Sequence, residues 1–251
     1  MKASHTSTLL AGFFAFLLFA CTYEAPNPPA PGFNKADSDL KAVGIADDVM
    51  QAMGGRPAWD STRCISWNFF GRRTLVWDKE AGLCRIEWLN RPLKIIVNTN
   101  DGSGRVLIDT TEQTHPDSLA KYLDMGKKVW INDSYWLLMP FKLKDSGVTL
   151  KYAGKGKTEK GEDADVLQLT FSKVGVTPDN RYNVWVDKKS RLVTQWAYYE
   201  KASDTEPKII NPWGDYQPYG RILLAGSRGE RGVLTPIRVS DAPPAGIFEK
   251  W

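Results

Sequence analysis

The sequence predicts a mainly β protein of the α+β class, in which a strongly curved antiparallel sheet of about eleven strands forms an incomplete barrel. Short segments with alternating apolar and polar residues recur between Ile65 and Val239, as in antiparallel strands. Turn-forming sequences such as Asn100 to Gly104 separate them. Because so many strands rarely stay in one flat open sheet, we expect the sheet to curl around its core, with an N-terminal helix and a helical lid.

Residues 1–20 have the features of a lipoprotein signal peptide. Lys2 precedes an apolar run from Leu9 to Ala20, which is shorter than the ~20 residues needed to span a bilayer as a helix. The run ends in a lipobox, Leu-Phe-Ala-Cys, whose cysteine is Cys21. We therefore expect cleavage before Cys21 and acylation of its thiol, which would anchor the protein to a membrane. The alternative is an ordinary secretory signal with an incidental cysteine.

The remaining chain is expected to consist of a tether and one domain. Residues 21–36 begin with the lipidated cysteine and hold four prolines, which favours an extended spacer. Residues 37–251 fit a single domain. Because the 33 Lys and Arg residues alternate with 29 Asp and Glu residues, there is no concentrated basic face, and we do not expect nucleic acid as a partner.

Two helical regions interrupt the strand pattern. The first has a cap at Asp37 or Ser38, apolar residues at spacings of three and four up to Met53, and a glycine pair that ends it. The second begins at Pro116 and is expected to end at Gly126. A separate apolar unit, Trp130 to Phe141, is expected to follow and to be broken by Pro140.

The strands are expected in an antiparallel meander. The first is expected to be one long strand, 65–77, that returns through 83–89. The others are expected at 93–99, 105–110, 148–153, 166–171, 182–187, 192–199, 209–213, 220–225 and 233–239.

Two cysteines remain beyond the lipobox, Cys64 and Cys84. An exported protein could form a disulfide between them. In the long-strand arrangement, however, Cys84 lies near Val76, and Cys64 lies at the far end of the strand. Because a disulfide needs Cα atoms within ~7 Å, we expect two separate buried thiols.

Large aromatic residues gather on one face of the predicted sheet. Alternation places Trp67, Phe69 and Trp77 together early in the chain, and Trp196 and Tyr198 together late in the chain. The ten tryptophans have two explanations. They fill a wide barrel, or they line a cleft for an apolar ligand.

Several segments together resemble bacterial envelope proteins related to the outer-membrane lipoprotein carrier and receptor, the LolA/LolB-like fold. These are the lipobox, the N-terminal helix ending in Met53-Gly54-Gly55, the strand segment 67–73, the unit 130–141 and the hairpin 182–193. The resemblance covers nearly the whole domain. It implies an unclosed barrel whose helical lid shelters acyl chains in an apolar interior. The chain is longer than a typical receptor, and Trp136 to Met139 is a candidate for the receptor's protruding apolar loop or for lid packing.

The resemblance and the aromatic face lead to a set of expectations about function. We expect a monomeric, non-enzymatic lipoprotein of the bacterial envelope, anchored to the outer membrane through its N-terminal lipid, that binds a lipid or another apolar ligand without a cofactor or metal. A role in lipid or lipoprotein sorting follows from the resemblance. The expected ligand-binding residues are Trp67, Phe69, Trp77, Trp130, Trp136, Leu138, Met139, Phe141, Trp185, Trp196 and Tyr198.

Catalytic chemistry finds little support in the residues present. His115 is the only histidine after the signal peptide, so His-rich metal sites are not expected, and no Gly-x-Ser-x-Gly motif accompanies it. Glu87 lies close to Arg85, where an inward carboxylate would have a lowered pKa and a structural role. Two alternatives stay open, a surface adhesin or assembly subunit and a hydrolase with paired carboxylates.

Overall fold

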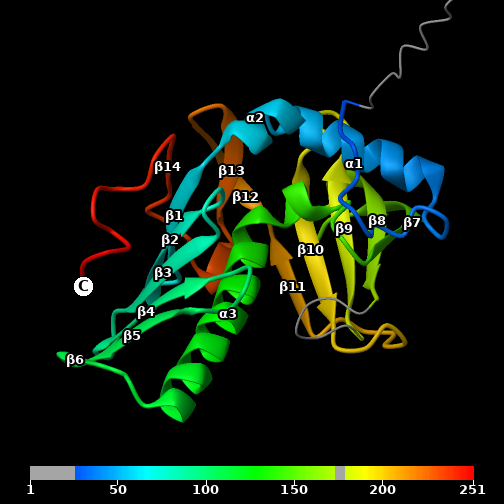
Figure 1. Ribbon diagram of the computed structural model, residues 1–251. Helices are drawn as coiled ribbons and strands as arrows, with labels where there is room; N and C mark the ends of the chain where they lie inside the picture. Colours follow the sequence, from blue (N-terminus) through cyan, green and yellow to red (C-terminus); the bar gives the residue numbers. More distant parts are fainter. Residues whose placement is uncertain (1–25, 173–178) are drawn as a thin grey trace, which may run out of the picture.

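The computed structural model describes residues 26–172 and 179–251, so the predicted signal peptide and Cys21 lie outside the described residues. The described part is α+β and mainly β, with antiparallel sheets that do not close into a barrel and one long helix, as the sequence predicts (Figure 1). No helix in this part is long and apolar enough to cross a membrane.

The first sheet has seven strands in the order β14-β1-β2-β3-β4-β5-β6. Its strands from β1 to β6 follow one another along the chain as a meander, and β14 pairs antiparallel with β1 at the other edge. The bounds are β1 Cys64–Phe69, β2 Arg73–Asp78, β3 Leu83–Trp88, β4 Leu93–Asn98, β5 Gly104–Ile108, β6 Thr111–Glu112 and β14 Arg238–Ser240.

The other strands form a five-stranded sheet, ordered β11-β10-β9-β8-β7, and a two-stranded sheet of β12 and β13. The expected single sheet of about eleven strands is therefore wrong in detail, since the described residues hold fourteen strands in three sheets. The bounds are β7 Val148–Lys157, β8 Asp163–Phe171, β9 Arg181–Asp187, β10 Val193–Tyr199, β11 Ile209–Pro212, β12 Gly214–Tyr219 and β13 Ile222–Ser227.

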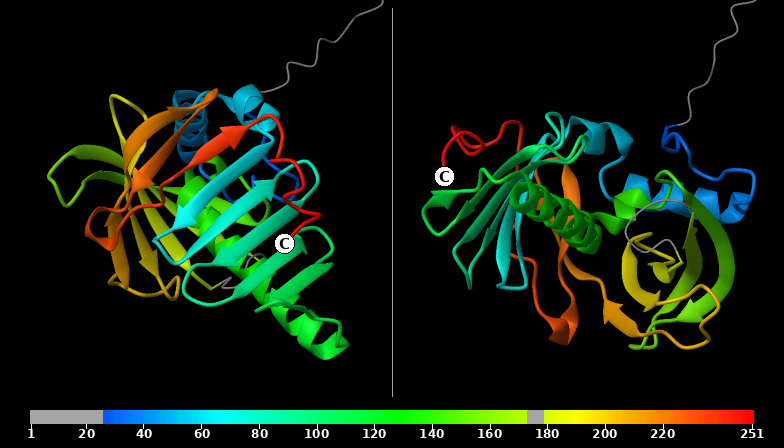
Figure 2. Two further views of the ribbon diagram at one scale, coloured as in Figure 1. Left: turned by 90° about the vertical axis from the view of Figure 1, so that its left-hand side faces the viewer. Right: turned by 60° about the horizontal axis from the view of Figure 1, so that its bottom comes forward.

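Backbone hydrogen bonds nevertheless join the three sheets into one curved wall. The Trp213 amide donates to the Thr194 carbonyl at 2.8 Å, next to β12. On the other side of the two-stranded sheet, the Leu234 amide donates to the Gly226 carbonyl, and the Leu234 carbonyl accepts from the Asn68 amide at 3.3 Å. The wall thus runs from β6 to β7 and leaves an opening between these edges, and Figure 2 shows the long helix between the two larger sheets.

The predicted long strand 65–77 is wrong, because a turn at Phe70 to Arg72 divides it into β1 and β2. Phe70 and Gly71 both have positive φ angles, 51° and 68°, which reverse the chain direction. The two strands pair with Ile65 opposite Trp77 and Trp67 opposite Leu75. The prediction that Trp67 and Trp77 share one face is nevertheless confirmed, because both side chains are buried.

The two cysteine thiols are free and buried. Cys64 on β1 pairs in register with Asp78 on β2, and Cys84 on β3 pairs with Trp77. The thiols are therefore kept apart by an intervening strand, not by the length of one strand as predicted.

The long helix α3, Pro116–Leu138, replaces the two separate helical units that the sequence predicts. Gly126 does not end it but lies buried within it, where an added Cβ would be 2.8 Å from the Cγ2 atom of Ile95. The glycine therefore permits close contact between α3 and β4. A short 3-10 helix, η1 (Met139–Lys142), follows at Pro140.

The N-terminal helix α1, Leu40–Ala52, ends before the glycine pair as predicted. A second short helix, α2 (Arg56–Ser61), was not predicted. In Figure 1, α1 and α2 lie across one end of the sheets. The Asp39 carboxylate accepts a hydrogen bond from the Tyr152 amide at 2.9 Å, which fixes the start of α1 against β7.

The segment 26–36 is part of the folded domain and does not behave as the expected extended spacer. The Ala30 amide donates to the Lys144 carbonyl, and the Asn34 amide donates to the Val148 carbonyl, both at 3.0 Å. The side chains of Asn27 and Phe33 are buried. The Lys144 ammonium group, also buried, contacts the Asn27 carbonyl and the Asp47 carboxylate.

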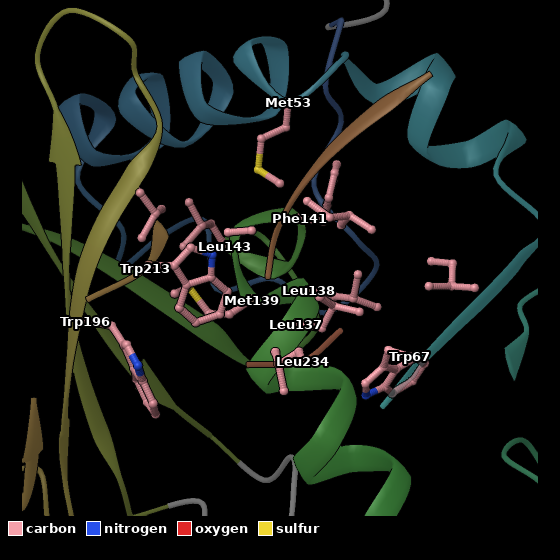
Figure 3. Close-up of a cluster of buried hydrophobic side chains, with 14 of the residues drawn as sticks. Met53, Trp67, Leu137, Leu138, Met139, Phe141, Leu143, Trp196, Trp213 and Leu234 are labelled. Atoms are coloured by element: carbon pink, nitrogen blue, oxygen red, sulfur yellow. The ribbon is translucent and has the colours of Figure 1, made fainter. Parts of the chain in front are cut away.

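One hydrophobic core fills most of the curved interior. It joins the end of α3 and η1 with α1 and with both larger sheets. Figure 3 shows members of this cluster, including Met53, Trp67, Leu138 and Met139, packed between the helices and the strands. Most of the predicted barrel interior is therefore occupied by the protein's own side chains.

Candidate functional site: an aromatic cleft beside the long helix

A cleft of about 270 Å³ lies between the second half of α3, the segment from η1 to β7, and the inner face of the five-stranded sheet. The volume is near the lower end of the range of small-molecule sites, ~300 to 1,000 Å³. The lining residues are Trp130, Ile131, Asn132, Ser134, Tyr135, Trp136, Lys142, Asp145, Ser146, Val148, Phe171, Tyr182 and Trp196.

Contiguous aromatic rings form the apolar wall of the cleft. The ring centroids of Tyr135 and Tyr182 are 5.3 Å apart, and those of Tyr182 and Trp196 are 5.1 Å apart. Trp136 contacts Trp196 edge to face at 4.9 Å, and Phe171 contacts Tyr182 at 5.4 Å. Such ring pairs contribute beyond their buried area, so the wall is held in place by its own contacts.

The aromatic wall draws on three elements that are distant in sequence. Alternation along β9 turns Tyr182 to the same face as the buried Val184 and Val186. Strand β10 places Tyr198 directly opposite Tyr182 and adds Trp196 beside it. The end of β8 adds Phe171, and α3 closes the cleft from the other side.

The polar part of the cleft carries one ion pair. Lys142 is the last residue of η1, and its ammonium group is 2.7 Å from the carboxylate of Asp145, three residues later. Among the described lining residues these are the only charged side chains. Because the two charges neutralise each other, the described lining of the cleft has no net charge for a ligand to match.

Burial keeps the cleft tyrosines in the neutral form. It raises the pKa of Tyr135 well above its usual value, with nearby Tyr182 and Asp145 adding to the effect. Burial also raises the pKa of Tyr182 to about 12, and the neighbouring Tyr198 contributes. Both phenols are therefore hydrogen-bond donors at neutral pH.

Three of the predicted ligand-binding residues line this cleft, namely Trp130, Trp136 and Trp196. Six others belong to the packed core instead. These are Trp67, Phe69, Trp77, Leu138, Met139 and Phe141. Alternation shows correctly that Trp67, Phe69 and Trp77 point inward, but α3 and η1, which carry the other three residues, occupy the space that they face. The candidate protruding loop, Trp136 to Met139, is likewise packed inside, because Leu137, Leu138 and Met139 are fully buried.

The two remaining predicted residues lie beside the cleft or away from it. The Tyr198 ring is 5.5 Å from that of Tyr182 but does not line the cleft. Trp185 lies on the opposite face of β9 from Tyr182, where it pairs with Val166 and approaches Gly156. The large side chain of Trp185 predicts a residue of the cleft wall, but its position in the alternation of β9 places it on the outer face of the sheet.

Several lining residues are not predicted by the sequence pattern, among them Tyr135, Phe171 and Tyr182. A signal for Tyr182 was available, since it shares its strand parity with Val184 and Val186. Tyr135 lies one residue before Trp136, inside the unit that was predicted as a lid. Nothing local in the sequence shows that Phe171 meets them.

A second, wider groove of about 530 Å³ lies along the first half of α3. It is lined by Arg73, Lys121, Tyr122, Asp124, Met125, Lys128, Val129 and Asn132. It carries several charged side chains, and three of its residues, Lys121, Asp124 and Lys128, are exposed. The aromatic cleft is the better candidate for an apolar ligand.

The carboxylates do not form a pair in either groove. Asp133 is fully buried and bound by Arg73, with Nε 2.5 Å from Oδ2. Glu87 does not face inward, because it shares its face of β3 with Arg85, which donates to the carbonyl of Ile247 in the C-terminal segment at 2.8 Å. His115 is exposed before the first turn of α3.

The described residues thus define an α+β protein with an incomplete antiparallel barrel, a long helix across its opening and an aromatic cleft beside that helix. No protein-family model matches the chain, and no curated protein is significantly similar to it. Among solved structures, the chain is similar to a DUF1329 family protein from Desulfovibrio piger ATCC 29098. The TM-score is 0.47 at 15% identity, covering 83% of this chain and 97% of that one.

Proposed function

We propose that this protein is a membrane-anchored lipoprotein of the bacterial envelope that binds a lipid or another apolar ligand in the aromatic cleft. The observation that carries the proposal is the continuous wall of rings from Tyr135 through Tyr182 to Trp196, next to an ion pair without net charge. Apolar surface buried there contributes ~25 cal/mol per Å². This is enough to hold an acyl chain without strong polar contacts.

The anchor and the location follow from the lipobox at Cys21. A lipid-anchored binding protein is stationary, so it would receive or present its ligand at a membrane. Together with the resemblance of the chain to the lipoprotein carrier and receptor, this supports a role in lipid or lipoprotein sorting at the outer membrane.

The binding test uses uptake of a fluorescent fatty-acid probe by the soluble Cys21→Ala form of the chain. Ile131→Asp places a charge in the cleft at a partly exposed position, so it is expected to weaken uptake at least about tenfold without unfolding the domain. Ile210→Asp is the matched control, because Ile210 is an exposed residue of β11 that does not line the cleft. Absence of uptake by the parent form would refute the proposal.

The positions Trp67 and Leu138 are unsuitable for this test. Both are buried in the core, so an aspartate there would unfold the domain whether or not it binds a ligand.

The anchor has its own test. Cys21→Ala is expected to release the exported protein from membranes, because it removes the thiol that carries the lipid. Fractionation after a high-salt wash measures the distribution. A variant that still sediments with membranes contradicts the assignment of the anchor.

A second candidate function is that of a surface adhesin or assembly subunit. The filled interior favours it, since Leu138 and Met139 occupy the space where an open barrel would hold its ligand. Leu89 is also 57% exposed beside Trp88, at the end of β3. If the parent form takes up no probe, this second function becomes the better interpretation.

A further inference from the structure

The hydroxyl group of Tyr135 is unusual among the tyrosines of the described chain. It is buried in the cleft wall and has no hydrogen-bond partner there. The hydroxyls of Tyr152 and Tyr216, in contrast, bind the Asp165 carboxylate and the Val193 carbonyl, each at 2.9 Å. A buried polar group without a partner is costly, so the Tyr135 hydroxyl calls for a partner that the described residues do not supply.

Two indole N–H groups on the same wall, those of Trp130 and Trp196, also lack an acceptor. They carry less weight, because the indole groups of Trp67 and Trp213 lack acceptors in the core as well. Among these unpaired groups, the Tyr135 hydroxyl therefore sets the cleft wall apart from the core.

The charges around the cleft limit what the partner can be. The Lys142 ammonium group is already paired with Asp145 at 2.7 Å, so the described lining residues offer no free cation to an anionic group. Burial of an unpaired carboxylate against aromatic rings is strongly unfavourable. A neutral acceptor oxygen, which needs only a donor, fits the wall better.

We propose that the cleft binds an apolar ligand that carries a neutral carbonyl oxygen, as in an ester or amide, and that this oxygen accepts a hydrogen bond from the Tyr135 hydroxyl. The inference rests on the proposed function and names the ligand class for the same site. The hydroxyl oxygen is buried while the Tyr135 ring is partly exposed. The ligand reaches the hydroxyl when side chains of the wall around it change rotamer, which is fast for partly exposed side chains.

The experiment compares Tyr135→Phe with the parent, both in the soluble Cys21→Ala form of the full chain. Methyl decanoate, undecane and decanoate are used as competitors against the fluorescent fatty-acid probe. The ratio of methyl decanoate affinity to undecane affinity is expected to fall about three- to tenfold in Tyr135→Phe, the effect of one hydrogen bond. Undecane itself should bind both forms equally well.

Tyr122→Phe is the matched control, since Tyr122 is on the same helix but lines the other groove. It should leave the ratio unchanged. The melting temperature of Tyr135→Phe should be no lower than that of the parent, because the hydroxyl it removes has no partner among the described residues. A marked decrease would reveal a protein partner for the hydroxyl and overturn the inference.

The failure of this inference differs from failure of the proposed function. If the fluorescent probe binds but Tyr135→Phe keeps the parent's ratio, the ligand class is wrong while the binding function stands. If decanoate is the tightest competitor and its affinity falls most in Tyr135→Phe, the acceptor is a carboxylate. The proposal of a neutral carbonyl ligand is then overturned. If the probe does not bind at all, the proposed function itself is wrong.

Discussion

Arg73 and Asp133 form a buried ion pair between β2 and α3. The guanidinium Nε and Nη2 atoms lie 2.5 and 2.6 Å from the two carboxylate oxygens. Asp133 is 0% exposed and Arg73 is 16% exposed. Burial raises the pKa of Asp133, and the hydrogen bonds from Arg73 only partly oppose this. The pair therefore fixes how α3 lies on the sheet more than it adds to stability.

Breaking this pair is expected to be costly, whereas replacing it is not. Asp133→Asn leaves the Arg73 charge buried without its counterion and should lower the free energy of unfolding by about 3 kcal/mol. The double variant Arg73→Met with Asp133→Leu should recover most of the loss. Urea denaturation of the parent, Asp133→Asn and the double variant measures these differences in unfolding free energy. Equal stability of Asp133→Asn and the parent would show that the ion pair does not form in solution.

Lys79 is a partly buried charge, and it makes stability depend on pH. Its ammonium group donates to the Trp59 carbonyl at 2.5 Å and lies 3.7 Å from the Trp59 ring centroid. Burial lowers the pKa of Lys79 to about 8. Because the unfolded chain keeps the proton up to about pH 10.4, stability from this residue should rise between pH 8 and 10.4.

The test is the difference in unfolding free energy between the parent and Lys79→Met, measured from pH 7 to 10. Subtraction removes the contribution of the buried cysteines, whose raised pKa values work in the opposite direction. The unfolding free energy of Lys79→Met should exceed that of the parent most at pH 7. The difference should become smaller as the pH rises toward 10. A difference that is independent of pH would mean that Lys79 is solvated.

Among the elements, α3 depends on a glycine that the sequence pattern presents as its end. Gly126 is a poor helix former, but a side chain there would contact Ile95 and Val97. Tertiary packing thus overrides local propensity. The prediction of two helical units failed for this reason, since nothing near Gly126 in sequence indicates that β4 lies against it.

Gly126→Ala is accordingly expected to destabilise the protein by about 1 to 3 kcal/mol, the usual cost of overpacking. Gly44→Ala is the matched control, because Gly44 is inside α1 and its added Cβ would meet nothing within 4 Å. That change should stabilise the protein by about 0.5 to 1 kcal/mol. Thermal denaturation of both variants measures these changes in stability. If Gly126→Ala stabilised the protein, α3 would have to lie farther from β4 than the structure shows.

The hairpin of β1 and β2 shows what alternation in a sequence can and cannot reveal. Its register pairs Ile65 with Trp77 and Phe69 with Arg73, so odd-numbered residues face odd-numbered residues across the turn. The inward-facing positions therefore keep the same parity on both sides of the turn. The alternation predicts which residues are buried, but it does not show the turn between the two strands.

The candidate site was predictable only in part for a related reason. Trp130 and Trp136 stand out in the sequence as large residues on an apolar segment, and Trp196 follows from the alternation in β10. The contact of Tyr135 with Phe171 and Tyr182 depends on how α3 lies against β8 and β9. Such long-range packing leaves no local periodicity.

At the scale of the whole molecule, the described fold begins earlier than the sequence suggests. Phe33 is 9% exposed within a proline-rich segment, and backbone bonds tie that segment to Lys144 and Val148. If the segment belongs to the domain, Phe33→Ala should lower the free energy of unfolding by about 3 kcal/mol.

Leu40→Ala is the control for that change, because Leu40 is 83% exposed and should matter little. A flexible spacer would instead make both substitutions neutral, and chemical denaturation separates the two cases.

The docked segment also sets how far the domain can stand from a bilayer once Cys21 is acylated. Only four residues, Thr22 to Ala25, separate that cysteine from the described fold. At ~3.5 Å per fully extended residue, they allow a clearance of roughly 14 Å. This is far less than a long proline-rich tether would permit. Under the proposed function, the acylated protein would stay within this distance of the headgroup layer, and a ligand from another membrane would have to be delivered to it.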